Sequence, residues 1–375
     1  MQLYIHVPFC RSKCRYCAFY SKPLDMDELA AYVAALPLEM RYWSRVLGRP
    51  RLETVYCGGG TPSLLPGWAL SRIVSEMQRH FDLDPGLEWT FEANPDSALD
   101  EGYLASLLRY GVNRLSLGLQ SLSEADLRLL GRPHDAQQAL AAYALAKRAG
   151  FANVSLDVMW GLPGQREGQW LEELKTLVGL RPEHLSCYGL TLEPGTPLAE
   201  EAAAGRLELP AETEQGRMYV HGAEYLEEQG YLQYEISNFA RMGYVSRHNS
   251  GYWEGRDYLG LGPAAVSTLA GRRHENPSDV RQWAAMVKAG KCGQGAVELT
   301  AEEKARELVM LSLRTAKGLR LAAYRKATGR DFFKDNEGLI TALRQNELIR
   351  ISDGHLRLTK NGFLVSNVIL ERLEF

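Results

Sequence analysis

Three cysteines near the start of the chain have the spacing of a metal centre. Cys10, Cys14 and Cys17 form a CxxxCxxC arrangement directly after a β-rich segment, and no fourth cysteine is nearby. Thiolates at this spacing can converge on zinc or on an iron–sulfur cluster. A structural zinc site needs a fourth protein ligand, for which His6 and Cys57 are candidates. The spacing favours a 4Fe–4S cluster with three cysteine-bound irons and one open iron, over zinc or three unligated core cysteines.

The composition of the chain indicates a protein with free thiols in a reducing compartment. Six cysteines in 375 residues are too few and too clustered for a disulfide framework. No apolar run approaches the roughly 18 residues of a spanning helix, and the N-terminus has no basic region followed by an apolar stretch. The formal net charge of -3 gives no general attraction to nucleic acid or an anionic membrane. We expect a cytoplasmic protein with at most peripheral membrane contact.

Six β-rich segments alternate with longer stretches of helical spacing. This order predicts parallel strands joined by right-handed crossovers, and therefore an α/β fold. The strand candidates are the segments 3–7, 53–57, 87–93, 113–119, 154–160 and 184–190. The stretches 27–47 and 135–149 are rich in Ala and Leu, which favours crossover helices there.

Each strand candidate ends in a polar, Gly-rich or Pro-rich turn. The turns are VPFC, CGGGTP, EANP, GLQS, WGLPGQ and LTLEPGTP. Because ligand sites in parallel α/β folds lie at the carboxyl ends of the strands, we expect these turns to meet at one mouth.

The second half of the chain is first irregular and then helical. A helix is expected over 212–229, a possible edge strand at YLQYEIS, and a loop at HNSGYWEGRDYLGLGPAA. Thr300 and Glu303 form a capping box before a helix that runs to about Thr315. We divide the chain into a partial barrel (1–205), an extension that carries the HNSGYW loop (206–295) and a C-terminal domain (296–375).

The C-terminal domain resembles a winged helix. Two further helices are expected over 320–328 and 337–346, and Asp353-Gly354 suits a two-residue type I′ turn between two strands. Winged helices often bind DNA, but the excess of Lys and Arg here is modest and unclustered. We therefore favour a structural or partner-docking role and expect no nucleic-acid partner.

Ten motifs in order along nearly the whole chain resemble the radical S-adenosylmethionine (SAM) superfamily. They are YIHVPFC, YCGGGTPS, FEANP, NRLSLGLQS, GRPH, SLDVMWGLPGQ, CYGLTLEPGTPL, YEISNFA, HNSGYW and GLGPAA. Within the superfamily they resemble the branch of oxygen-independent coproporphyrinogen III oxidase and the HemW-type heme chaperones. The resemblance implies a partial (β/α)6 TIM-like barrel, and a 4Fe–4S cluster whose unique iron is chelated by the amino and carboxylate groups of SAM. When reduced, such a cluster cleaves SAM to a 5′-deoxyadenosyl radical.

The resemblance also implies a role for each matching residue. The cluster ligands would be Cys10, Cys14 and Cys17, and the SAM-binding residues would be Tyr4, Tyr16, Gly59, Gly60, Thr61, Glu92, Gln120, Arg132 and Asp157. Tyr16 would contact the adenine, and the glycines, which let a backbone approach a ligand closely, would bind the amino-acid end of SAM. The alternatives are a flexible turn, or a phosphate loop that lacks its Lys-Ser/Thr, at Gly58 to Gly60, and helix caps or surface ion pairs at the single polar residues.

Three features favour the chaperone side of this branch. Phe19 stands where the decarboxylating oxidase has an extra cysteine, and only three residues precede Tyr4. The third feature is HNSGYW, in which His248 could ligate heme iron, and Asn249, Tyr252 and Trp253 would complete the contact. The alternative is that Asn249 caps a turn and both aromatic side chains fill the core.

The resemblance thus implies a heme chaperone that carries a SAM-coordinated cluster and delivers heme to an apo-protein. Its alternatives are oxidative decarboxylation of coproporphyrinogen III, heme ring opening and methyl transfer, all through a SAM-derived radical. Whether the chain is an enzyme stays open at this point. If SAM is cleaved, an electron donor of the flavodoxin or ferredoxin type is a further expected partner.

Overall fold

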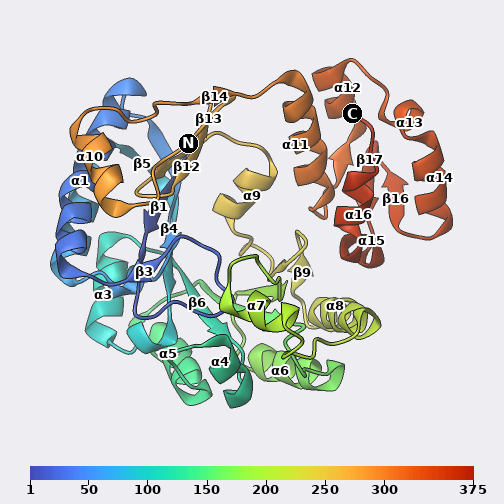
Figure 1. Cartoon of the computed structure of the whole chain (residues 1–375), viewed down its shortest axis with the longest axis horizontal. Coiled ribbons are helices and arrows are strands. Elements are labelled where there is room, and N and C mark those ends of the chain that lie inside the picture. Colours follow the sequence, from blue (N-terminus) through green and yellow to red (C-terminus); the bar gives the residue numbers. More distant parts are fainter. The chain divides into compact units, whose positions relative to one another are not determined.

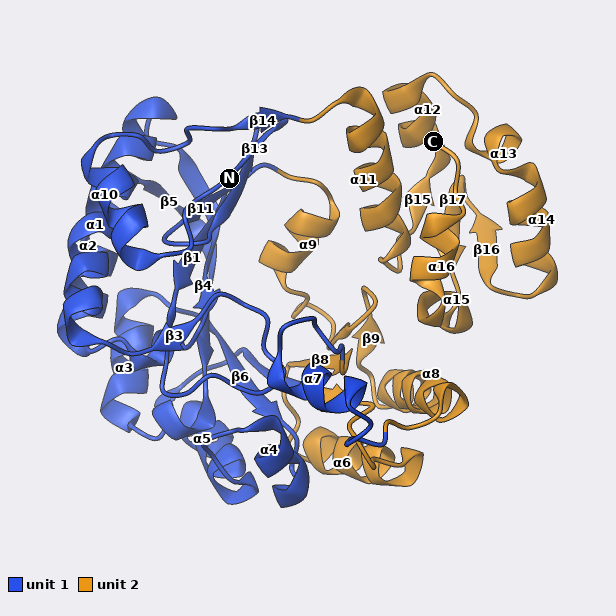
Figure 2. Cartoon of the chain, in the orientation of Figure 1, with its two compact units in different colours: residues 1–158, 191–208, 257–298 blue, residues 159–190, 209–256, 299–375 orange.

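The computed structural model describes residues 1–375, and the chain divides into two compact units (Figures 1 and 2). Unit 1 contains Met1–Val158, Thr191–Glu208 and Asp257–Glu298, and unit 2 contains Met159–Leu190, Leu209–Arg256 and Leu299–Phe375. None of the helices combines the length and the apolar composition needed to cross a lipid bilayer.

Unit 1 consists of a mixed sheet, a separate parallel pair formed by β2 and β3, and helices. Its strands are β1 (Gln2–Val7), β2 (Phe9–Cys10), β3 (Lys22–Pro23), β4 (Arg51–Gly59), β5 (Asp82–Ala93), β6 (Arg114–Gln120), β7 (Val154–Trp160, which ends in unit 2), β11 (Tyr258–Leu261), β12 (Val266–Leu269), β13 (Arg272–Glu275) and β14 (Val297–Glu298). Its helices are α1 (Met26–Val46), α2 (Gly67–His80), α3 (Glu101–Tyr110), α4 (Glu124–Leu130), α5 (Ala136–Ala149), α7 (Pro197–Ala203) and α10 (Val280–Lys288), with 3-10 turns η1 (Pro62–Leu64) and η2 (Pro95–Ser97).

The strand order in unit 1 is β14-β13-β12-β11-β1-β4-β5-β6-β7. Strands β1, β4, β5, β6 and β7 pair in parallel and in sequence order, as the strand–helix alternation predicts. β11 adds a further parallel strand beside β1, and β12, β13 and β14 extend this edge in antiparallel pairs. Each of these four added strands has four residues or fewer, too short for an alternating pattern to appear in the sequence.

The parallel strands separate apolar from polar side chains with a period of two. In β1, Leu3, Ile5 and Val7 are buried in the hydrophobic core, whereas Tyr4 and His6 belong to the alternate set. The alternate positions of the neighbouring strands are also polar or glycine: Tyr56, Gly58, Thr90, Glu92, Arg114, Ser116 and Asp157. One face of the sheet is therefore a packed core, and the opposite face carries the functional groups.

Helices α10, α1, α2, α3 and α5 succeed one another along the apolar face of this sheet (Figure 2). The side chain of Asp25 caps α1 by accepting the N–H of Glu28 at 2.9 Å. Asp135 and Gln138 form a capping box on α5, which ends at Gly150 in the left-handed conformation. These signals account for the two crossover helices that the composition predicts over 27–47 and 135–149.

Unit 2 begins with α6 (Glu167–Gly179) and β8 (His184–Gly189), and continues with α8 (Glu212–Glu228), β9 (Leu232–Gln233), β10 (Asn238–Ala240) and α9 (Arg247–Trp253). Its β8, β10 and β9 are successive neighbours, with antiparallel pairing of β10 to both strands. The predicted edge strand YLQYEIS is too long, because β9 ends at Gln233 and Glu235 forms only an isolated antiparallel bridge with Thr315. The N–H of Ile236 donates to the carbonyl oxygen of Arg314 at 2.9 Å, while the buried Glu235 carboxylate accepts from the backbone N–H groups of Ser237 and Asn238.

The C-terminal part of unit 2 has its own core. It contains α11 (Ala301–Leu313), β15 (Leu319–Arg320), α12 (Leu321–Thr328), α13 (Phe332–Asp335), α14 (Glu337–Gln345), β16 (Ile349–Ser352), β17 (His355–Leu358), α15 (Lys360–Leu364) and α16 (Ser366–Glu371). The three predicted helices and the hairpin are present, and Asp353 and Gly354 both have positive φ, as a type I′ turn requires. The sequence analysis missed the two-residue β15, which pairs with β17, and the three short helices.

Candidate cofactor site

The three cysteines lie on one loop after β1. Cys10 ends β2, whose pairing with β3 is extended by a hydrogen bond from the N–H of Leu24 to the carbonyl oxygen of Cys10 at 3.0 Å. Cys14 and Cys17 flank a tight turn in which the N–H of Cys17 donates to the carbonyl oxygen of Cys14 at 3.3 Å. All three thiols are free and half-buried, so they are held in place and still reachable.

Two side chains from other elements donate hydrogen bonds to these thiols. The Thr61 hydroxyl, which follows β4, lies 3.5 Å from the Sγ of Cys10, and Nη1 of Arg132, which follows α4, lies 3.3 Å from the Sγ of Cys14. Donors and a guanidinium charge stabilise the thiolate form that iron binding requires. The cysteine loop is therefore surrounded by groups that suit a set of thiolate ligands.

Asn94 joins the two donors. Its Nδ2 donates to Oγ1 of Thr61 at 3.1 Å, and its Oδ1 accepts from Nη2 of Arg132 at 2.7 Å. The same Arg132 nitrogen donates to the carbonyl oxygen of Gly118 at 2.8 Å. The turns after β4, β5 and β6 thus meet at the cysteine loop. Asn94 was not among the predicted site residues, although it lies in the quoted turn EANP.

A fifth segment reaches the same loop. The N–H of Leu198 donates to the carbonyl oxygen of Arg15 at 2.9 Å, and the Arg15 guanidinium forms an ion pair with Glu201. Leu198 immediately follows the turn LTLEPGTP, which was predicted to lie at the mouth. We call the meeting point of these segments the carboxyl edge of unit 1: the cysteine loop, the ends of β4, β5 and β6, Arg132 after α4, and α7.

The ionisation of the thiols is set by their surroundings. Burial raises the pKa of Cys10, against the Thr61 hydrogen bond and the Arg132 charge, which both lower it. Burial likewise raises the pKa of Cys17. No three His, Cys, Asp or Glu side chains gather closely enough to hold a single metal ion.

The glycine turn after β4 leaves no room for side chains. Gly59 has φ of 108°, and a Cβ atom there would lie 2.5 Å from the His6 ring. A Cβ at Gly60 would lie 2.6 Å from the carbonyl oxygen of Phe9. The N–H groups of Gly59, Gly60 and Thr61 donate to Glu92, Val7 and Phe9, respectively. These N–H groups are already used within the protein, so a ligand here would meet carbonyl oxygens, which accept hydrogen bonds.

Glu92 lies near the end of β5, on the polar face of the sheet, and contacts the glycine turn at Gly59. Its Oε1 accepts from the Tyr56 hydroxyl at 2.6 Å, and its Oε2 accepts from the N–H of Gly59 at 3.2 Å. Burial raises the pKa of Glu92 to about 7, and the nearby Asp157 adds to the rise, whereas the hydrogen bond from Tyr56 opposes it. A cationic ligand beside Glu92 would shift it toward the carboxylate.

Asp157 lies on the same face in β7. It accepts from the hydroxyl of Ser116 at 3.0 and 3.1 Å and from that of Ser155 at 3.0 Å. Burial raises its pKa, whereas these hydrogen bonds and the charge of Arg114 lower it. Arg114, which is only 2% exposed, was not among the predicted site residues. A charged residue in a mostly apolar strand is the sequence feature that could have pointed to it.

The other predicted SAM residues also belong to unit 1. The Tyr4 hydroxyl lies 2.9 Å from Nδ1 of His6, while Nε2 of His6 lies 2.8 Å from the carbonyl oxygen of Tyr20. Tyr16 is half-buried in the turn between Cys14 and Cys17. Gln120 is buried at the end of β6, where its φ of 70° accompanies a shift in the pairing with β7.

The residues predicted to contact heme lie in unit 2 and form a helix, so the expected loop at HNSGYW is wrong. Ser246 caps α9 by accepting the N–H of Asn249 at 3.3 Å, and this cap accounts for the helix. His248 is fully buried, and its Nε2 lies 3.0 Å from the Tyr252 hydroxyl, with the two rings at right angles. Asn249, Tyr252 and Trp253 are half-buried.

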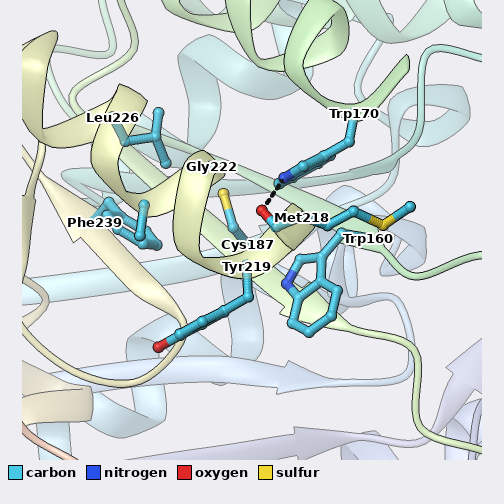
Figure 3. Close-up of a pocket in the computed structure, with 9 residues that line it drawn as sticks. Trp160, Trp170, Cys187, Met218, Tyr219, Gly222, Leu226 and Phe239 are labelled. Atoms are coloured by element: carbon cyan, nitrogen blue, oxygen red, sulfur yellow. Dashed lines mark hydrogen bonds between the residues drawn. The ribbon is translucent and has the colours of Figure 1, made fainter. Parts of the chain in front are cut away.

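Unit 2 also contains a small apolar hollow (Figure 3). Side chains of α6, α8, β8 and β10 surround it, including Trp170, Met218 and Cys187. The indole N–H of Trp170 donates to the carbonyl oxygen of Met218 at 3.0 Å. The lining carries no charged group, so this hollow offers little to a charged ligand.

Two sequence matches and one structural match define the class of protein. Residues 4–177 match the radical SAM superfamily, and residues 299–365 match the HemN C-terminal domain. The fold superposes with a TM-score of 0.82 on the solved structure of coproporphyrinogen III oxidase (HemN) from Escherichia coli, described as a radical SAM enzyme. The match covers 99% of this chain and 89% of that chain at 23% identity. The predicted fold class is confirmed: this is a radical SAM core with a HemN-type C-terminal domain.

Individual relatives narrow the class. The chain is 34% identical to the heme chaperone HemW of Bacillus subtilis, over 98% of this chain and 97% of that protein. It is 31% identical to the heme chaperone HemW of Lactococcus lactis, over 98% and 96%. It is 43% identical to the bovine mitochondrial radical S-adenosyl methionine domain-containing protein 1, over 70% of this chain and 59% of that protein. The chain belongs to the HemW family of radical SAM proteins.

Proposed function

We propose that the protein is a heme chaperone that carries a SAM-coordinated 4Fe–4S cluster, binds heme and delivers it to an apo-protein. The observation that carries this proposal is the similarity to HemW proteins over nearly the whole length of both chains. Phe19 supports it, because it is two residues beyond Cys17, where the decarboxylating oxidase has an additional cysteine.

Cys10, Cys14 and Cys17 would hold the cluster. The donor set fits, because the three thiols are half-buried on one loop and two of them accept hydrogen bonds from Thr61 and Arg132. Three thiolates on three different irons lie farther apart than three ligands of one ion, which accords with the absence of a site for a single metal ion. When bound, the cluster supplies electron transfer to SAM.

The polar groups of the carboxyl edge would bind SAM. The carbonyl oxygens of Gly59 and Gly60 would accept from its ammonium group, since the N–H groups of these residues are already used. Thr61, whose carbonyl oxygen already accepts from the N–H of Leu64 at 3.0 Å, would complete this end of the pocket. Glu92 would add a carboxylate beside the same cationic group. Arg132 would meet the SAM carboxylate, because a guanidinium suits such a group.

Tyr4, Tyr16, Gln120 and Asp157 would complete the pocket around the adenine, the ribose and the amino-acid end of SAM. A bound SAM would exclude water from this polar face of the sheet. A reduced flavodoxin or ferredoxin would supply electrons to the loaded protein.

Heme would be bound as cargo, with contacts from His248, Asn249, Tyr252 and Trp253 in α9. Because His248 is fully buried beside Tyr252, ligation of heme iron by this histidine would require α9 to open. A heme contact through the half-buried Trp253 and Tyr252 would not.

Hemin titration of the cluster-reconstituted protein tests the proposal. We expect a shifted Soret band and retention of about one heme per chain after gel filtration. Protein that retains its cluster but releases all hemin would contradict it. His248→Ala separates the two kinds of heme contact: an unchanged Soret band indicates a contact without ligation by His248, whereas a changed band indicates a ligand.

Coproporphyrinogen III decarboxylation is the second candidate, favoured by the shared fold with HemN. An anaerobic assay with coproporphyrinogen III, SAM and a chemical reductant separates it from the first. We expect no protoporphyrinogen. Formation of this product with turnover would replace the chaperone proposal with the enzyme.

A further inference from the structure

A carboxylate far from the cysteine loop in sequence lies in the interior of unit 1. We propose that Glu39 of α1 is a positioning residue, whose side chain holds the loop after β11 against His6 and thereby fixes the geometry of the SAM pocket. The inference rests on the proposed function, in which Tyr4 and Gly59 line that pocket.

The contacts of Glu39 come from three separate places in the chain. The side chain is 0% exposed. Its Oε2 accepts from the N–H of Gly262 at 2.8 Å and from the indole N–H of Trp283 at 3.2 Å. Its Oε1 accepts from Nδ2 of Asn276 at 2.7 Å, and that nitrogen also donates to the carbonyl oxygen of Gly262 at 2.8 Å. Both backbone groups of Gly262 are therefore hydrogen-bonded, its N–H to Glu39 and its carbonyl oxygen to Asn276.

The hydrogen bonds of Glu39 have one direction. Gly262, Trp283 and Asn276 all donate, which suits an acceptor-only carboxylate and not an amide. Burial raises the pKa of Glu39 to about 7, while these hydrogen bonds oppose the rise. Burying a carboxylate costs free energy, whereas an apolar side chain at position 39 would avoid this cost. The carboxylate can accept the three hydrogen bonds that hold the loop, and this positioning role is a physical reason for a glutamate here.

The loop after β11 packs closely against the backbone of His6. Gly262 has φ of 97°, and a Cβ atom there would lie 2.5 Å from the carbonyl oxygen of His6. The register of β11 and β1 places Leu261 opposite Ile5, directly before this contact. From the other side, the hydroxyl of Tyr32 donates to the same His6 carbonyl oxygen at 3.0 Å.

His6 transmits this position to the proposed pocket. Its ring bridges the Tyr4 hydroxyl and the carbonyl oxygen of Tyr20, at 2.9 and 2.8 Å. The same ring fills the space beside Gly59, where a Cβ atom would lie 2.5 Å away. A displacement of the β11 loop would therefore move His6, and with it Tyr4 or Gly59. The motif GLGPAA, which begins in β11, thereby acquires a role.

Variants that exchange the donor and the acceptor of the Glu39–Asn276 hydrogen bond test the positioning role of Glu39. Glu39→Gln places an amide NH2 group against N–H donors, and Asn276→Asp places a second carboxylate against Glu39. The double variant Glu39→Gln/Asn276→Asp restores a donor and an acceptor facing each other, with exchanged positions. Val33→Ala is the matched control, because it weakens the buried face of the same helix without touching these hydrogen bonds.

Two readouts are measured on each full-length variant: hydrogen–deuterium exchange of the cofactor-free protein and SAM affinity of the reconstituted protein. For Glu39→Gln we expect faster exchange in 259–266, in 3–9 and in 57–61, with about tenfold weaker SAM binding. The double variant should recover part of both, and Val33→Ala should lower the melting temperature without either change.

Faster exchange in 259–266 alone, or wild-type SAM affinity in Glu39→Gln, would overturn the positioning role and leave Glu39 a structural group. Wild-type protein that binds no SAM would refute the proposed function instead, and the exchange of 3–9 and 57–61 would still decide whether Glu39 holds His6.

Discussion

The carboxyl edge of unit 1 and the helix α9 of unit 2 use their polar side chains in opposite ways. At the carboxyl edge, Arg132 bonds to Cys14, Asn94 and Gly118, which belong to three different segments. In α9, His248 bonds to Tyr252 one helical turn away, and the Ser246 side chain accepts the N–H of Asn249. The side-chain hydrogen bonds of the carboxyl edge join separate segments, whereas these two hydrogen bonds of α9 stay within one helix and its cap.

The difference shows that topology, more than residue type, builds a site. Parallel strands deliver their ends to one edge, so short polar turns from distant parts of the sequence meet there. The α9 segment contains His, Tyr and Trp, which suit heme, but its cap at Ser246 turns His248 and Tyr252 toward each other. A histidine with aromatic neighbours is therefore weaker support for a ligand site than convergence of several segments.

The largest expected effect comes from removing a cysteine at the carboxyl edge. Cys14→Ala leaves two thiolates for the cluster, and we expect loss of nearly all iron and of the absorbance near about 400 nm after reconstitution. Cys187→Ala is the control, since this buried thiol lies in unit 2. Equal iron content in Cys14→Ala and Cys187→Ala would remove the distinction between the two regions.

The next effect belongs to Glu235 in unit 2. Burial raises its pKa from 4.5 in the unfolded chain to about 7, so the folded protein binds the extra proton between these values. The contribution of Glu235 to stability is therefore complete below about pH 4.5 and is lost as the pH rises to about 7, by at most about 3 kcal/mol. Glu235→Gln should remove that part of the pH dependence in urea unfolding. An unchanged profile would show that Glu235 does not have the raised pKa.

A smaller effect is expected at Gly59 of the carboxyl edge. Gly59→Ala forces a side chain toward the His6 ring at positive φ, so SAM binding should weaken by about tenfold or more. Gly48→Ala is the matched control, because Gly48 also has positive φ but no neighbouring atom within 4 Å of a Cβ. Isothermal titration with SAM compares them. If both variants bind SAM equally, the close approach to His6 has no role in the pocket.

The smallest effect is expected at Phe19. Its side chain is 71% exposed, so Phe19→Ala should change the free energy of unfolding by less than about 0.5 kcal/mol. Iron content should stay at the wild-type level, because Phe19 supplies no ligand. Loss of the cluster in this variant would show that the exposed Phe19 side chain contributes to the cluster site.

The sequence predicted the parts of the molecule that repeat a simple pattern. Six strands, two crossover helices and the type I′ hairpin follow from alternation, caps and turn residues. The family resemblance assigned roles to Cys10, Thr61 and Arg132, and the structure brings Thr61 to Cys10 and Arg132 to Cys14.

Residues that act through long-range contacts were not predictable in this way. Glu39 and Asn276 are 237 positions apart, and no local pattern pairs them. The sequence suggests His6 only as a candidate metal ligand, whereas its ring lies between the Tyr4 hydroxyl and the carbonyl oxygen of Tyr20 and is within hydrogen-bond distance of both. Arg114 belongs to the polar face of the sheet, a set that becomes visible only once the register of β5, β6 and β7 is known.

Electron paramagnetic resonance of the reduced, reconstituted protein with and without SAM is the direct test of a SAM-coordinated cluster. We expect about four iron and four sulfide atoms per chain, and a spectrum of a reduced 4Fe–4S cluster whose g values shift when SAM is added. A spectrum that SAM leaves unchanged, or an iron content that Cys10→Ala, Cys14→Ala and Cys17→Ala do not lower, would contradict it.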